Sequence, residues 1–442
     1  MGNQSYASRA TMKAIILSIG DELVLGQTVD TNSAWISQQL TAVGCDIAAH
    51  ATVPDDQEAI ENSIRSSIGM ADVLILSGGI GPTEDDLTRQ ALAAVMGVPL
   101  DLNEAWLARL QEFFTKLGRA MPATNQIQAM IPRGATIIEN TNGTAAGIQA
   151  TLTSTNAKSK IQNAETDVFV MPGVPKEMKV MFTRDVLPHI AKATAGAAIV
   201  SRTLHTFGLG ESWVAEKLGE LMTRGRNPSV GTTVANGIVS LRVNSRFETR
   251  ERALNELERT AAACETCLGE IIFGVDDETL PQIVGRLLTS EKKTVATAES
   301  CTGGLVAKML TDAPGSSAYF KQGWITYSNE AKSQQLRISS ELIVEEGAVS
   351  EAVAVAMAMH SAEIATADYA ISITGIAGPS GGTPEKPVGT VWIALCDNVR
   401  KNQPTVARRF TFPGDRDMVR DRSAKMALTI LRYHMLGVPM PF

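Results

Sequence analysis

The chain has 442 residues, which is too long for one hydrophobic core and predicts two to four domains. A hydrophobic content of 44% and a charged content of 20% are ordinary for globular proteins. The net charge of −7 disfavours a general nucleic-acid binder, which would need a basic face. The net charge does not exclude nucleotide ligands, because a few local hydrogen-bond donors are enough to bind an anionic nucleotide.

The cysteines and the N-terminal segment narrow the class of protein further. Five cysteines are few and odd in number, which argues against the disulfide framework of a small secreted protein. Cys264 and Cys267 form a CxxC, but no second pair completes a zinc site, so we interpret them as packing residues of a helix. The first 13 residues contain no apolar segment, Tyr6 breaks the myristoylation pattern, and no segment reaches the length of a membrane span. We therefore expect a cytoplasmic protein without a membrane anchor.

Strands and helices alternate through the first hundred residues. The expected strands are continuous apolar segments, which is typical of a parallel sheet covered by helices on both faces. In such sheets ligands bind beyond the carboxyl ends of the strands. The expected strands are 14–19, 47–53 and 72–77, and the expected helices are 33–43, 57–70 and 86–96.

Two loops follow strands of this sheet and combine glycine with acidic residues. They are Gly20-Asp21-Glu22 and the segment GGIGPTEDD at 78–86. Glycines let phosphate oxygens approach the backbone, and carboxylates can bind the divalent cation that pyrophosphate hydrolysis needs. The alternative is that Glu84, Asp85 and Asp86 only cap the helix expected to begin near Asp86. The two roles can coexist.

The pattern changes between residues 198 and 274. A strand at 203–207 precedes a helix at 211–222, and a second helix at 250–268 precedes a strand at 271–273. Between the helices, two strands flank Asn236-Gly237, which is a strong hairpin signal. The order β-α-β-β-α-β is the split βαβ arrangement and predicts a small domain of its own.

The segment TAESCTGG at 297–304 places Ser300 and Cys301 side by side between a strand at 294–297 and a helix that begins near Leu305. A serine nucleophile needs a neighbouring base. His360 lies in a helical segment and His434 lies close to the C-terminus, so both are weak candidates for this base. Lys332 is stronger, because it lies in the first turn of a helix capped by Ser328 or Asn329, where burial and the helix dipole lower a lysine pKa.

Other groups complete this candidate site. Free backbone N–H groups near Thr302 and Gly303 could stabilise an oxyanion. The loop SITGIAGPSGG at 372–382 offers a hydroxyl and exposed amides, and Arg416 in PGDRD suits a phosphate. Without further information, a serine–lysine hydrolase competes with a glycine-rich α/β domain that carries a surface lysine.

Six motifs in register resemble the C-terminal domain of the CinA family: TAESCTGG, TYSNEAK, GAVSE, SITGIAGPSGG, KPVGTVW and FPGDRD. The resemblance implies deamidation of nicotinamide mononucleotide to nicotinic acid mononucleotide and ammonia, without a cofactor. It implies that Ser300 attacks and that Lys332 accepts its proton, directly or through Tyr327. The implied substrate-binding residues are Thr302, Gly303, Thr374, Gly375, Gly378 and Arg416.

The motifs IGDELVLGQTVDTN, SGGIGPTEDDLT, NGTAAG and MPGVPKEM resemble the molybdopterin-binding fold of MoaB and MogA, in the form that opens CinA proteins. The resemblance implies a three-layer α/β domain and a metal-dependent ADP-ribose pyrophosphatase that releases AMP and ribose 5-phosphate. The fold also hosts pterin binding, and the acidic residues serve either ligand. The implied substrate-binding residues are Asn32, Gly78, Gly79, Gly81 and Thr83, and the expected ligands of a divalent metal are Asp21, Glu22, Glu84, Asp85 and Asp86.

We therefore expect an α/β protein of three domains: a MoaB/MogA-like domain at 13–185, a small KH-like domain at 186–274 and a CinA deamidase domain at 275–440. The middle domain lacks a basic GxxG loop at Gly225, so we expect a spacer or dimer role rather than RNA binding. The leading hypothesis is a hydrolase of pyridine-nucleotide salvage that forms a homodimer. The alternatives are a pterin-handling protein with a degenerate C-terminal domain and a nucleotide-sensing protein of DNA uptake (competence) or the DNA-damage response, which would bind without turnover.

Overall fold

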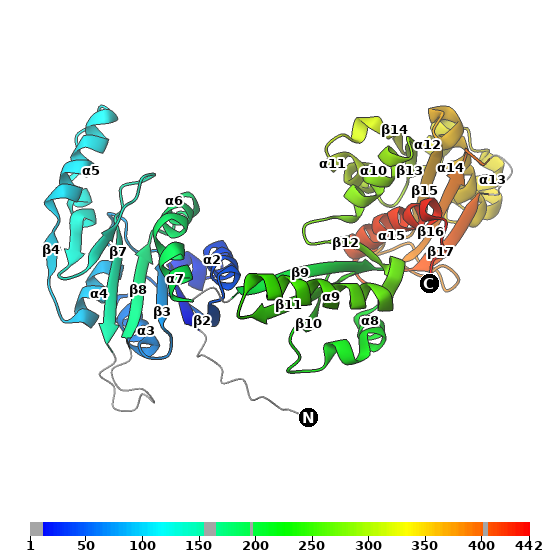
Figure 1. The fold of residues 1–442 in the computed structure, drawn as a ribbon. Helices are drawn as coiled ribbons and strands as arrows, with labels where there is room; N and C mark the ends of the chain where they lie inside the picture. The colour runs from blue at the N-terminus through cyan, green and yellow to red at the C-terminus, as the bar shows by residue number, and fades with distance from the viewer. Residues whose placement is uncertain (1–11, 154–164, 195–197, 401–404) are drawn as a thin grey trace, which may run out of the picture. The chain divides into compact units, whose positions relative to one another are not determined.

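The computed structural model describes residues 12–153, 165–194, 198–400 and 405–442 (Figure 1). The chain packs into two compact units, Met1–Val200 with Ser245–Glu256, and Ser201–Asn244 with Leu257–Phe442. We describe each unit by itself. Residues 1–11, on which the expectations about a signal peptide and myristoylation rest, lie outside the described residues.

A six-stranded sheet forms the centre of the N-terminal domain, in the order β2-β1-β3-β8-β7-β6. The first four strands are parallel, as the apolar segments predict. β7 runs antiparallel to both of its neighbours, β8 and β6, so the sheet is mixed. The strands are β1 (Lys13–Ile19), β2 (Asp46–Val53), β3 (Val73–Ser77), β6 (Thr136–Ile138), β7 (Gly147–Thr153) and β8 (Glu165–Met171), and a separate pair consists of β4 (Leu100–Leu102) and β5 (Met130–Pro132).

Helices cover both faces of this sheet, because neighbouring side chains of each buried strand point to opposite faces. Ile15 of β1 packs into the core beneath α3, α4 and α5, and Ile16 packs into the core beneath α2, α6 and α7. The three-layer prediction is confirmed. The helices are α1 (Asp21–Val24), α2 (Thr31–Ala42), α3 (Gln57–Ser67), α4 (Thr88–Met96), α5 (Glu104–Lys116), α6 (Pro175–Met181) and α7 (Leu187–Ala193), with short turns η1 (Ala123–Ala129) and η2 (Phe182–Val186).

The start of α4 corrects one interpretation of the acidic loop. The helix begins at Thr88, and its N-cap residue, Leu87, makes no side-chain cap. Glu84, Asp85 and Asp86 therefore do not cap the helix, and the alternative that they serve only as caps is wrong.

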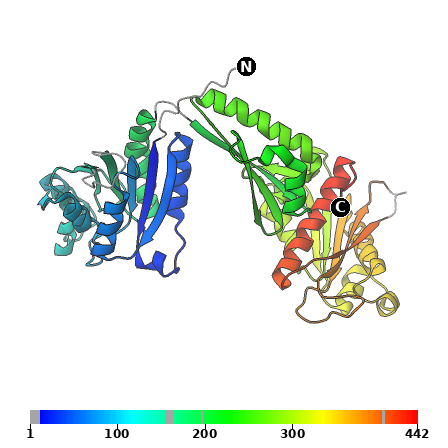
Figure 2. The same ribbon diagram turned by 90° about the horizontal axis from the view of Figure 1, so that it is seen from below.

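The middle module has the predicted order β-α-β-β-α-β, and its strands form a sheet in the order β10-β11-β9-β12. Asn236 and Gly237 have φ values of 50° and 76°, so they make the expected tight hairpin. Figure 2 shows the long helix α9 along one face of this sheet. The elements are β9 (Ala198–Phe207), α8 (Glu211–Leu218), η3 (Gly219–Met222), β10 (Ser229–Ala235), β11 (Ile238–Phe247), α9 (Arg250–Leu268), η4 (Gly269–Ile271) and β12 (Ile272–Val275).

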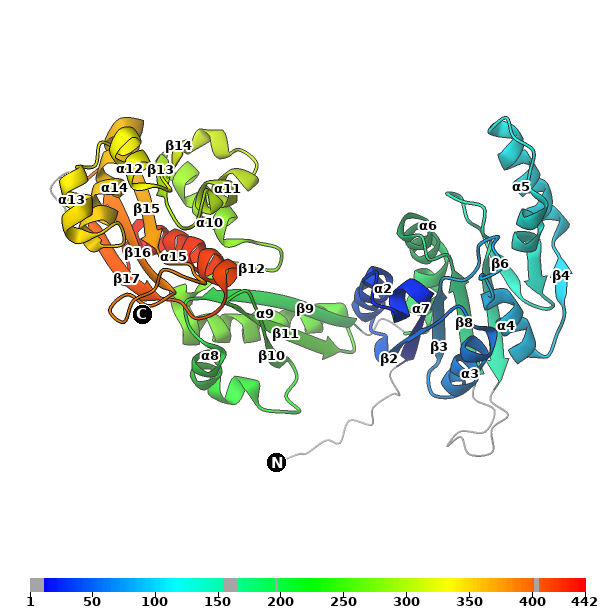
Figure 3. The same cartoon turned by 180° about the vertical axis from the view of Figure 1, so that it is seen from behind.

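The C-terminal domain contains a five-stranded sheet in the order β14-β13-β15-β16-β17. β14, β13 and β15 are parallel, and β16 is antiparallel to both of its neighbours. One core lies beneath α10, α11 and α15, and another lies beneath α12, α13 and α14. Figure 3 shows this domain from behind.

The strands of the C-terminal sheet are β13 (Val295–Glu299), β14 (Phe320–Ile325), β15 (Tyr369–Gly375), β16 (Thr390–Asp397) and β17 (Val406–Thr411). Its helices are α10 (Leu280–Ser290), α11 (Leu305–Asp312), η5 (Ser316–Ala318), α12 (Asn329–Leu336), α13 (Ser340–Glu346), α14 (Glu351–Ala365) and α15 (Arg416–Leu436). In the described part of the chain, no helix is long and apolar enough to cross a membrane.

Topology brings the predicted C-terminal residues to one edge of this sheet. β13, β14, β15 and β17 run in the same direction, so the residues that follow them lie at the same end. These residues are Ser300, Tyr327, Ile376 and Arg416, and the last two lie in the glycine-rich loop and the PGDR turn. The edge collects side chains that are more than 100 residues apart in the sequence.

Candidate active sites

The turn that carries Ser300 is fixed by the residue before it. Glu299 is buried, and its carboxylate accepts hydrogen bonds from the backbone N–H groups of Gly304, Val306 and Ala307 at 3.0, 3.1 and 2.8 Å. Gly303 and Gly304 have φ values of 60° and 92°, which glycine adopts without strain. The strand end and the start of α11 are thereby locked together around the nucleophile candidate.

Lys332 lies against Ser300. Its Nζ donates to the Ser300 Oγ at 3.1 Å and to the Thr326 carbonyl oxygen at 2.9 Å. The lysine is 1% exposed, and burial lowers its pKa. Ser328 caps α12, as one of the two predicted alternatives, by accepting from the Ala331 N–H. Among the described residues, no carboxylate forms an ion pair with Lys332, so little opposes the neutral amine that a general base requires.

The structure separates Ser300 from the other nucleophile and base candidates. Burial raises the pKa of the Cys301 thiol to about 12, so its thiolate is scarce at neutral pH. His360 bonds to the Leu336 carbonyl oxygen, and His434 pairs with Asp397. These two histidines are therefore committed to structural contacts, and the base beside Ser300 is Lys332.

The amides predicted to stabilise an oxyanion differ in availability. The Ser300 N–H donates to the Ile373 carbonyl oxygen and the Gly303 N–H donates to the Ser300 carbonyl oxygen. Within the described contacts, the Thr302 N–H has no acceptor, and the buried Thr302 hydroxyl also has none. Arg420 donates to the Thr302 carbonyl oxygen at 2.9 Å, which fixes the orientation of this peptide. Thr302 is therefore the better placed donor of the two predicted residues.

The remaining predicted residues surround this centre in different ways. Arg416 donates to the Tyr327 hydroxyl at 2.8 Å and to the Gly378 carbonyl oxygen at 2.7 Å, and both Arg416 and Tyr327 are exposed. In the described contacts Tyr327 bonds to neither Ser300 nor Lys332, so its relay role stays a prediction. Thr374 is buried and its hydroxyl donates to the Ala348 carbonyl oxygen. Gly375 lies against β16, where a Cβ would meet the Thr390 carbonyl oxygen at 2.8 Å.

The second candidate site is a cavity of about 480 Å³ at the carboxyl edge of the N-terminal sheet. Seven of the predicted residues line it: Glu22, Gly78, Gly79, Gly81, Thr83, Asp85 and Asp86. Asp21 and Glu84 do not line this cavity. Asn32 lines a smaller adjoining cavity of about 140 Å³ and donates to the Ser77 hydroxyl and the Gly173 carbonyl oxygen, while its buried Oδ1 has no partner among the described residues.

Asp86 shapes the glycine-rich loop. Its Oδ1 accepts from the Gly81 N–H at 2.6 Å, and its Oδ2 accepts from the Thr83 N–H at 2.9 Å and from the Thr83 hydroxyl. Both carboxylate oxygens are therefore used within the loop. The structure gives Asp86 a structural role, and a metal would have to compete with these bonds.

Asp55 is an acidic residue of this cavity that sequence reasoning missed. It follows β2, and its Oδ2 accepts from the Asp21 N–H at 2.9 Å. Burial raises the pKa of Asp55, and the negative charges of Asp21, Glu22 and Asp86 add to that rise. β2 is parallel to β1 and ends at the same edge, so the strand-end rule covers this loop as well, but the search for glycine combined with acidic residues passed over it because residues 54–56 contain no glycine.

The donor set fits a metal that arrives with a phosphate ligand. In the described part of the chain, no three Asp, Glu, His or Cys side chains are close enough to hold an ion by themselves. Magnesium is commonly bound by only one or two carboxylates together with substrate phosphates and water. Glu22 of α1, Asp55 of the loop after β2 and Asp85 of the loop after β3 surround one cavity and supply such carboxylates.

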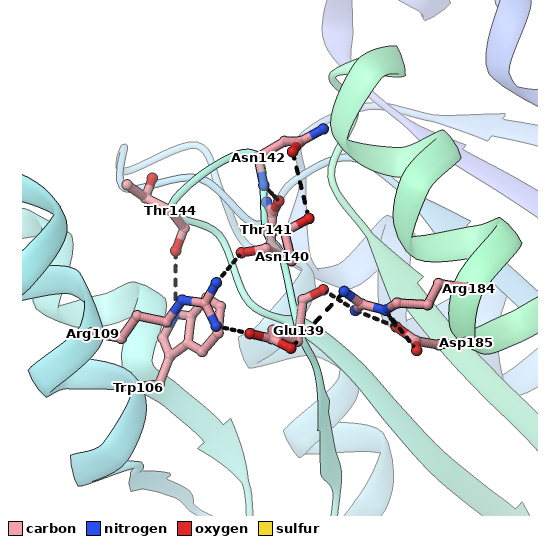
Figure 4. A network of polar contacts seen from close by, with 9 residues as sticks. All are labelled: Trp106, Arg109, Glu139, Asn140, Thr141, Asn142, Thr144, Arg184 and Asp185. Carbon is pink, nitrogen blue, oxygen red and sulfur yellow. Dashed lines mark hydrogen bonds and ion pairs between the residues drawn. The ribbon is translucent and has the colours of Figure 1, made fainter.

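A polar network positions the NGTAAG loop at the cavity wall (Figure 4). Trp106 of α5 donates to the Thr144 carbonyl oxygen at 3.2 Å, and Arg109 donates to the Asn140 carbonyl oxygen at 3.2 Å. Arg109 also pairs with Glu139, whose carbonyl oxygen accepts from Arg184 at the other side. The network explains how Thr144 and Ala145, which line the cavity, are fixed in place.

Fold and sites together define a fused α/β protein with a molybdopterin-fold domain at one end and a buried serine–lysine pair at the other. Three family models match in turn: "Probable molybdopterin binding domain" at 15–192, "Damage-inducible protein CinA KH domain" at 201–274 and "CinA C-terminal domain" at 277–435. The chain belongs to the CinA family.

Relatives match over nearly the whole chain. A competence-damage inducible protein of Symbiobacterium thermophilum is 40% identical over 433 residues, which cover 96% of this chain and 99% of that protein. One from Caldicellulosiruptor bescii is 39% identical over 95% of this chain and 98% of its own length. A CinA superfamily structure from Klebsiella pneumoniae is 34% identical and covers 36% of this chain and 96% of its own, with a TM-score of 0.34.

The burial of Cys301 leads to a prediction about thiol reactivity. Cys264 is buried as expected, but Cys267 is exposed, so its interpretation as a packing residue is wrong. Iodoacetamide at pH 8 should modify Cys267 and leave Cys301 unmodified in the folded protein, because alkylation requires an accessible thiolate. Mass spectrometry of peptides after brief labelling measures this, and labelling in urea provides the control in which both react. Rapid modification of Cys301 in the folded protein would contradict its assignment as a packing residue.

Proposed function

We propose that the C-terminal domain is a serine–lysine amidase that converts nicotinamide mononucleotide to nicotinic acid mononucleotide and ammonia. The observation that carries the proposal is the 3.1 Å contact between the buried Lys332 Nζ and the Ser300 Oγ. A lysine this deeply buried and without a carboxylate partner in the described residues favours its neutral form. The choice of substrate rests on the resemblance of the surrounding motifs to the CinA family.

The chemistry follows from this geometry. When Lys332 is neutral, the hydrogen bond between the two side chains reverses, and the Ser300 hydroxyl donates to the Lys332 Nζ. Lys332 then accepts the hydroxyl proton as the Ser300 Oγ attacks the carboxamide carbon. The Thr302 N–H would donate to the developing oxyanion. Protonated Lys332 returns the proton to the departing nitrogen, which leaves as ammonia. Water then attacks the acyl-enzyme with Lys332 again as the base, which regenerates Ser300.

The outer residues supply the means to orient a nucleotide. Arg416 is exposed and already bonded to Tyr327 and Gly378, so its guanidinium is pre-organised for a phosphate. Tyr327 accepts from Arg416, which leaves the phenol proton free to donate to a ligand. These two residues are candidates for binding the ribose phosphate.

We propose a second activity, ADP-ribose pyrophosphatase, for the N-terminal domain. The favouring observation is one cavity in which glycine-rich backbone meets carboxylates from α1 and from the loops after β2 and β3. One or two of Glu22, Asp55 and Asp85, together with the pyrophosphate oxygens, would hold a divalent cation, which would neutralise the pyrophosphate and activate water. A pterin ligand is the competing occupant of this cavity, and a nucleotide sensor would bind without turnover.

Substitution of the pair tests the amidase. Wild type should release ammonia from nicotinamide mononucleotide, and Cys301→Ala should retain most of that activity. Ser300→Ala and Lys332→Met should lose at least about 10³-fold in kcat, since each removes the nucleophile or its base. The matched control is Lys308→Met, because Lys308 is an exposed lysine on α11. A dead Cys301→Ala, or full activity in Ser300→Ala, would overturn the assignment.

The lowered pKa of Lys332 predicts the direction of the pH profile. The neutral amine is the active form, so kcat/KM should rise as pH increases through the Lys332 pKa and then level off. Because burial lowers that pKa, the inflection should lie below the value of about 10.4 typical of a free lysine. Stopped assays from pH 6 to pH 10 measure it. A profile that falls over this range would contradict a lysine base.

Metal removal separates the two proposed activities. EDTA should abolish ADP-ribose hydrolysis and leave ammonia release from nicotinamide mononucleotide unchanged, and added magnesium should restore the former. Asp55→Asn should reduce ADP-ribose hydrolysis at least about tenfold, whereas Glu58→Gln, on the exposed side of α3, serves as the control. AMP and ribose 5-phosphate are quantified by chromatography. Hydrolysis that persists in EDTA would argue against a metal at this site.

A further inference from the structure

Arg89 is the most deeply buried arginine side chain near the N-terminal cavity. It is 0% exposed, lies on α4, and does not line the cavity itself. Burial lowers its pKa to about 10, while the negative charge of nearby Asp86 acts in the opposite direction, so Arg89 remains a cation at neutral pH. Among the described residues, no carboxylate forms an ion pair with it within 4 Å. A buried guanidinium without an ion pair is costly, which suggests that it performs a task.

The hydrogen bonds of Arg89 and its neighbour Thr88 show what that task is. Arg89 donates to the carbonyl oxygens of Ile80 and Gly81 through its two terminal nitrogens. Thr88 donates its hydroxyl to the Gly78 carbonyl oxygen and its N–H to the Gly79 carbonyl oxygen, both at 3.0 Å. Four consecutive carbonyl oxygens of the loop are thus bound by the first two residues of α4.

This arrangement controls which backbone groups a ligand can meet. With the carbonyl oxygens turned toward α4, the N–H groups of Gly79 and Ile80 have no acceptor within the described residues. Gly79 has a φ of 65°, in the left-handed region, whereas the next residue, Ile80, has a negative φ, and this change of hand between neighbouring residues is the one that backbone anion nests use. The glycines are also needed for space, since a Cβ at Gly79 would meet the Thr88 Oγ at 2.2 Å.

We propose that Arg89 and Thr88 are positioning residues that turn loop 78–81 into an anion-binding nest, with the Arg89 charge behind the loop raising its affinity for a pyrophosphate group. The inference deepens the pyrophosphatase proposal and rests on the same cavity. It concerns anion binding, however, so it can be tested without turnover. It predicts that these two residues, which do not line the cavity, affect binding of a ligand inside it.

The test is calorimetric titration of the full-length protein with inorganic pyrophosphate and magnesium. All proteins carry Arg416→Ala, which removes the C-terminal candidate for phosphate binding. Arg89→Met should weaken binding about tenfold or more, and Arg89→Lys, which keeps the charge but loses the planar fork, should lose less. Thr88→Val should weaken binding about threefold, while Thr88→Ser, which keeps the hydroxyl, should bind like its parent. Arg65→Met is the control, because Arg65 is a half-exposed arginine on α3 that lies away from the cavity.

The outcomes are distinguishable. Unchanged pyrophosphate binding by a folded Arg89→Met protein would overturn the inference, as would parental proteins that bind no pyrophosphate. If Arg89→Met does not fold, the comparison of the two Thr88 variants tests the inference. Equal pyrophosphate binding by Thr88→Val and Thr88→Ser would then overturn it. For active proteins, the loss should appear in the KM for ADP-ribose more than in kcat, which general destabilisation would not produce. A wild type that binds pyrophosphate but never cleaves ADP-ribose removes the pyrophosphatase proposal and leaves this inference standing.

Discussion

The C-terminal domain depends on one buried contact, the approach of the Lys332 Nζ to the Ser300 Oγ. Withdrawing an ammonium group from water costs several kcal/mol unless the group finds a counter-charge or loses its proton. The surroundings of Lys332 offer a carbonyl oxygen at the end of β14 and a hydroxyl at the end of β13, and neither carries a charge. The environment therefore shifts the proton equilibrium of Lys332 toward the amine, which is the form that the proposed mechanism requires of the base for Ser300.

The same constraint explains the role of Glu299. A carboxylate next to a buried lysine would be its natural ion-pair partner, and such a pair would keep the lysine charged. The carboxylate oxygens of Glu299 instead accept hydrogen bonds from three backbone N–H groups at the start of α11. The helix N-terminus stabilises the negative charge, and the lysine is left with neutral neighbours. In the proposed mechanism, the bonding of this acid to the helix rather than to the lysine is part of what allows Lys332 to act as a base.

The two sheets illustrate what a sequence can and cannot predict. Apolar strands separated by helices predicted the layers, and the rule that ligands bind beyond the carboxyl ends of strands selected the loops at 20–22 and 78–86. The pairing of Ser300 with Lys332 follows instead from the need of a serine nucleophile for a neighbouring base, and the structure brings the two side chains together. Asp55 was not among the predicted residues, because the loops were selected for glycine combined with acidic residues and the loop after β2 contains no glycine. The bonds of Asp86 depend on the curvature of loop 78–86, and the burial of Arg89 runs against the usual exposure of charged residues. Side-chain partners in irregular loops follow from tertiary packing, which local patterns do not encode.

The nucleophile is also part of the sheet itself. The Ser300 N–H bonds to Ile373 of β15, so the backbone of the serine extends the ladder between β13 and β15. Hydrogen exchange at this amide then requires opening of the central strands rather than fraying of a loop, so the proposed nucleophile belongs to a part of the domain that should exchange slowly. Under the proposed amidase reaction, a substrate would have to adapt to a nucleophile that does not move, and discrimination between substrates would fall to the exposed side chains of Tyr327 and Arg416.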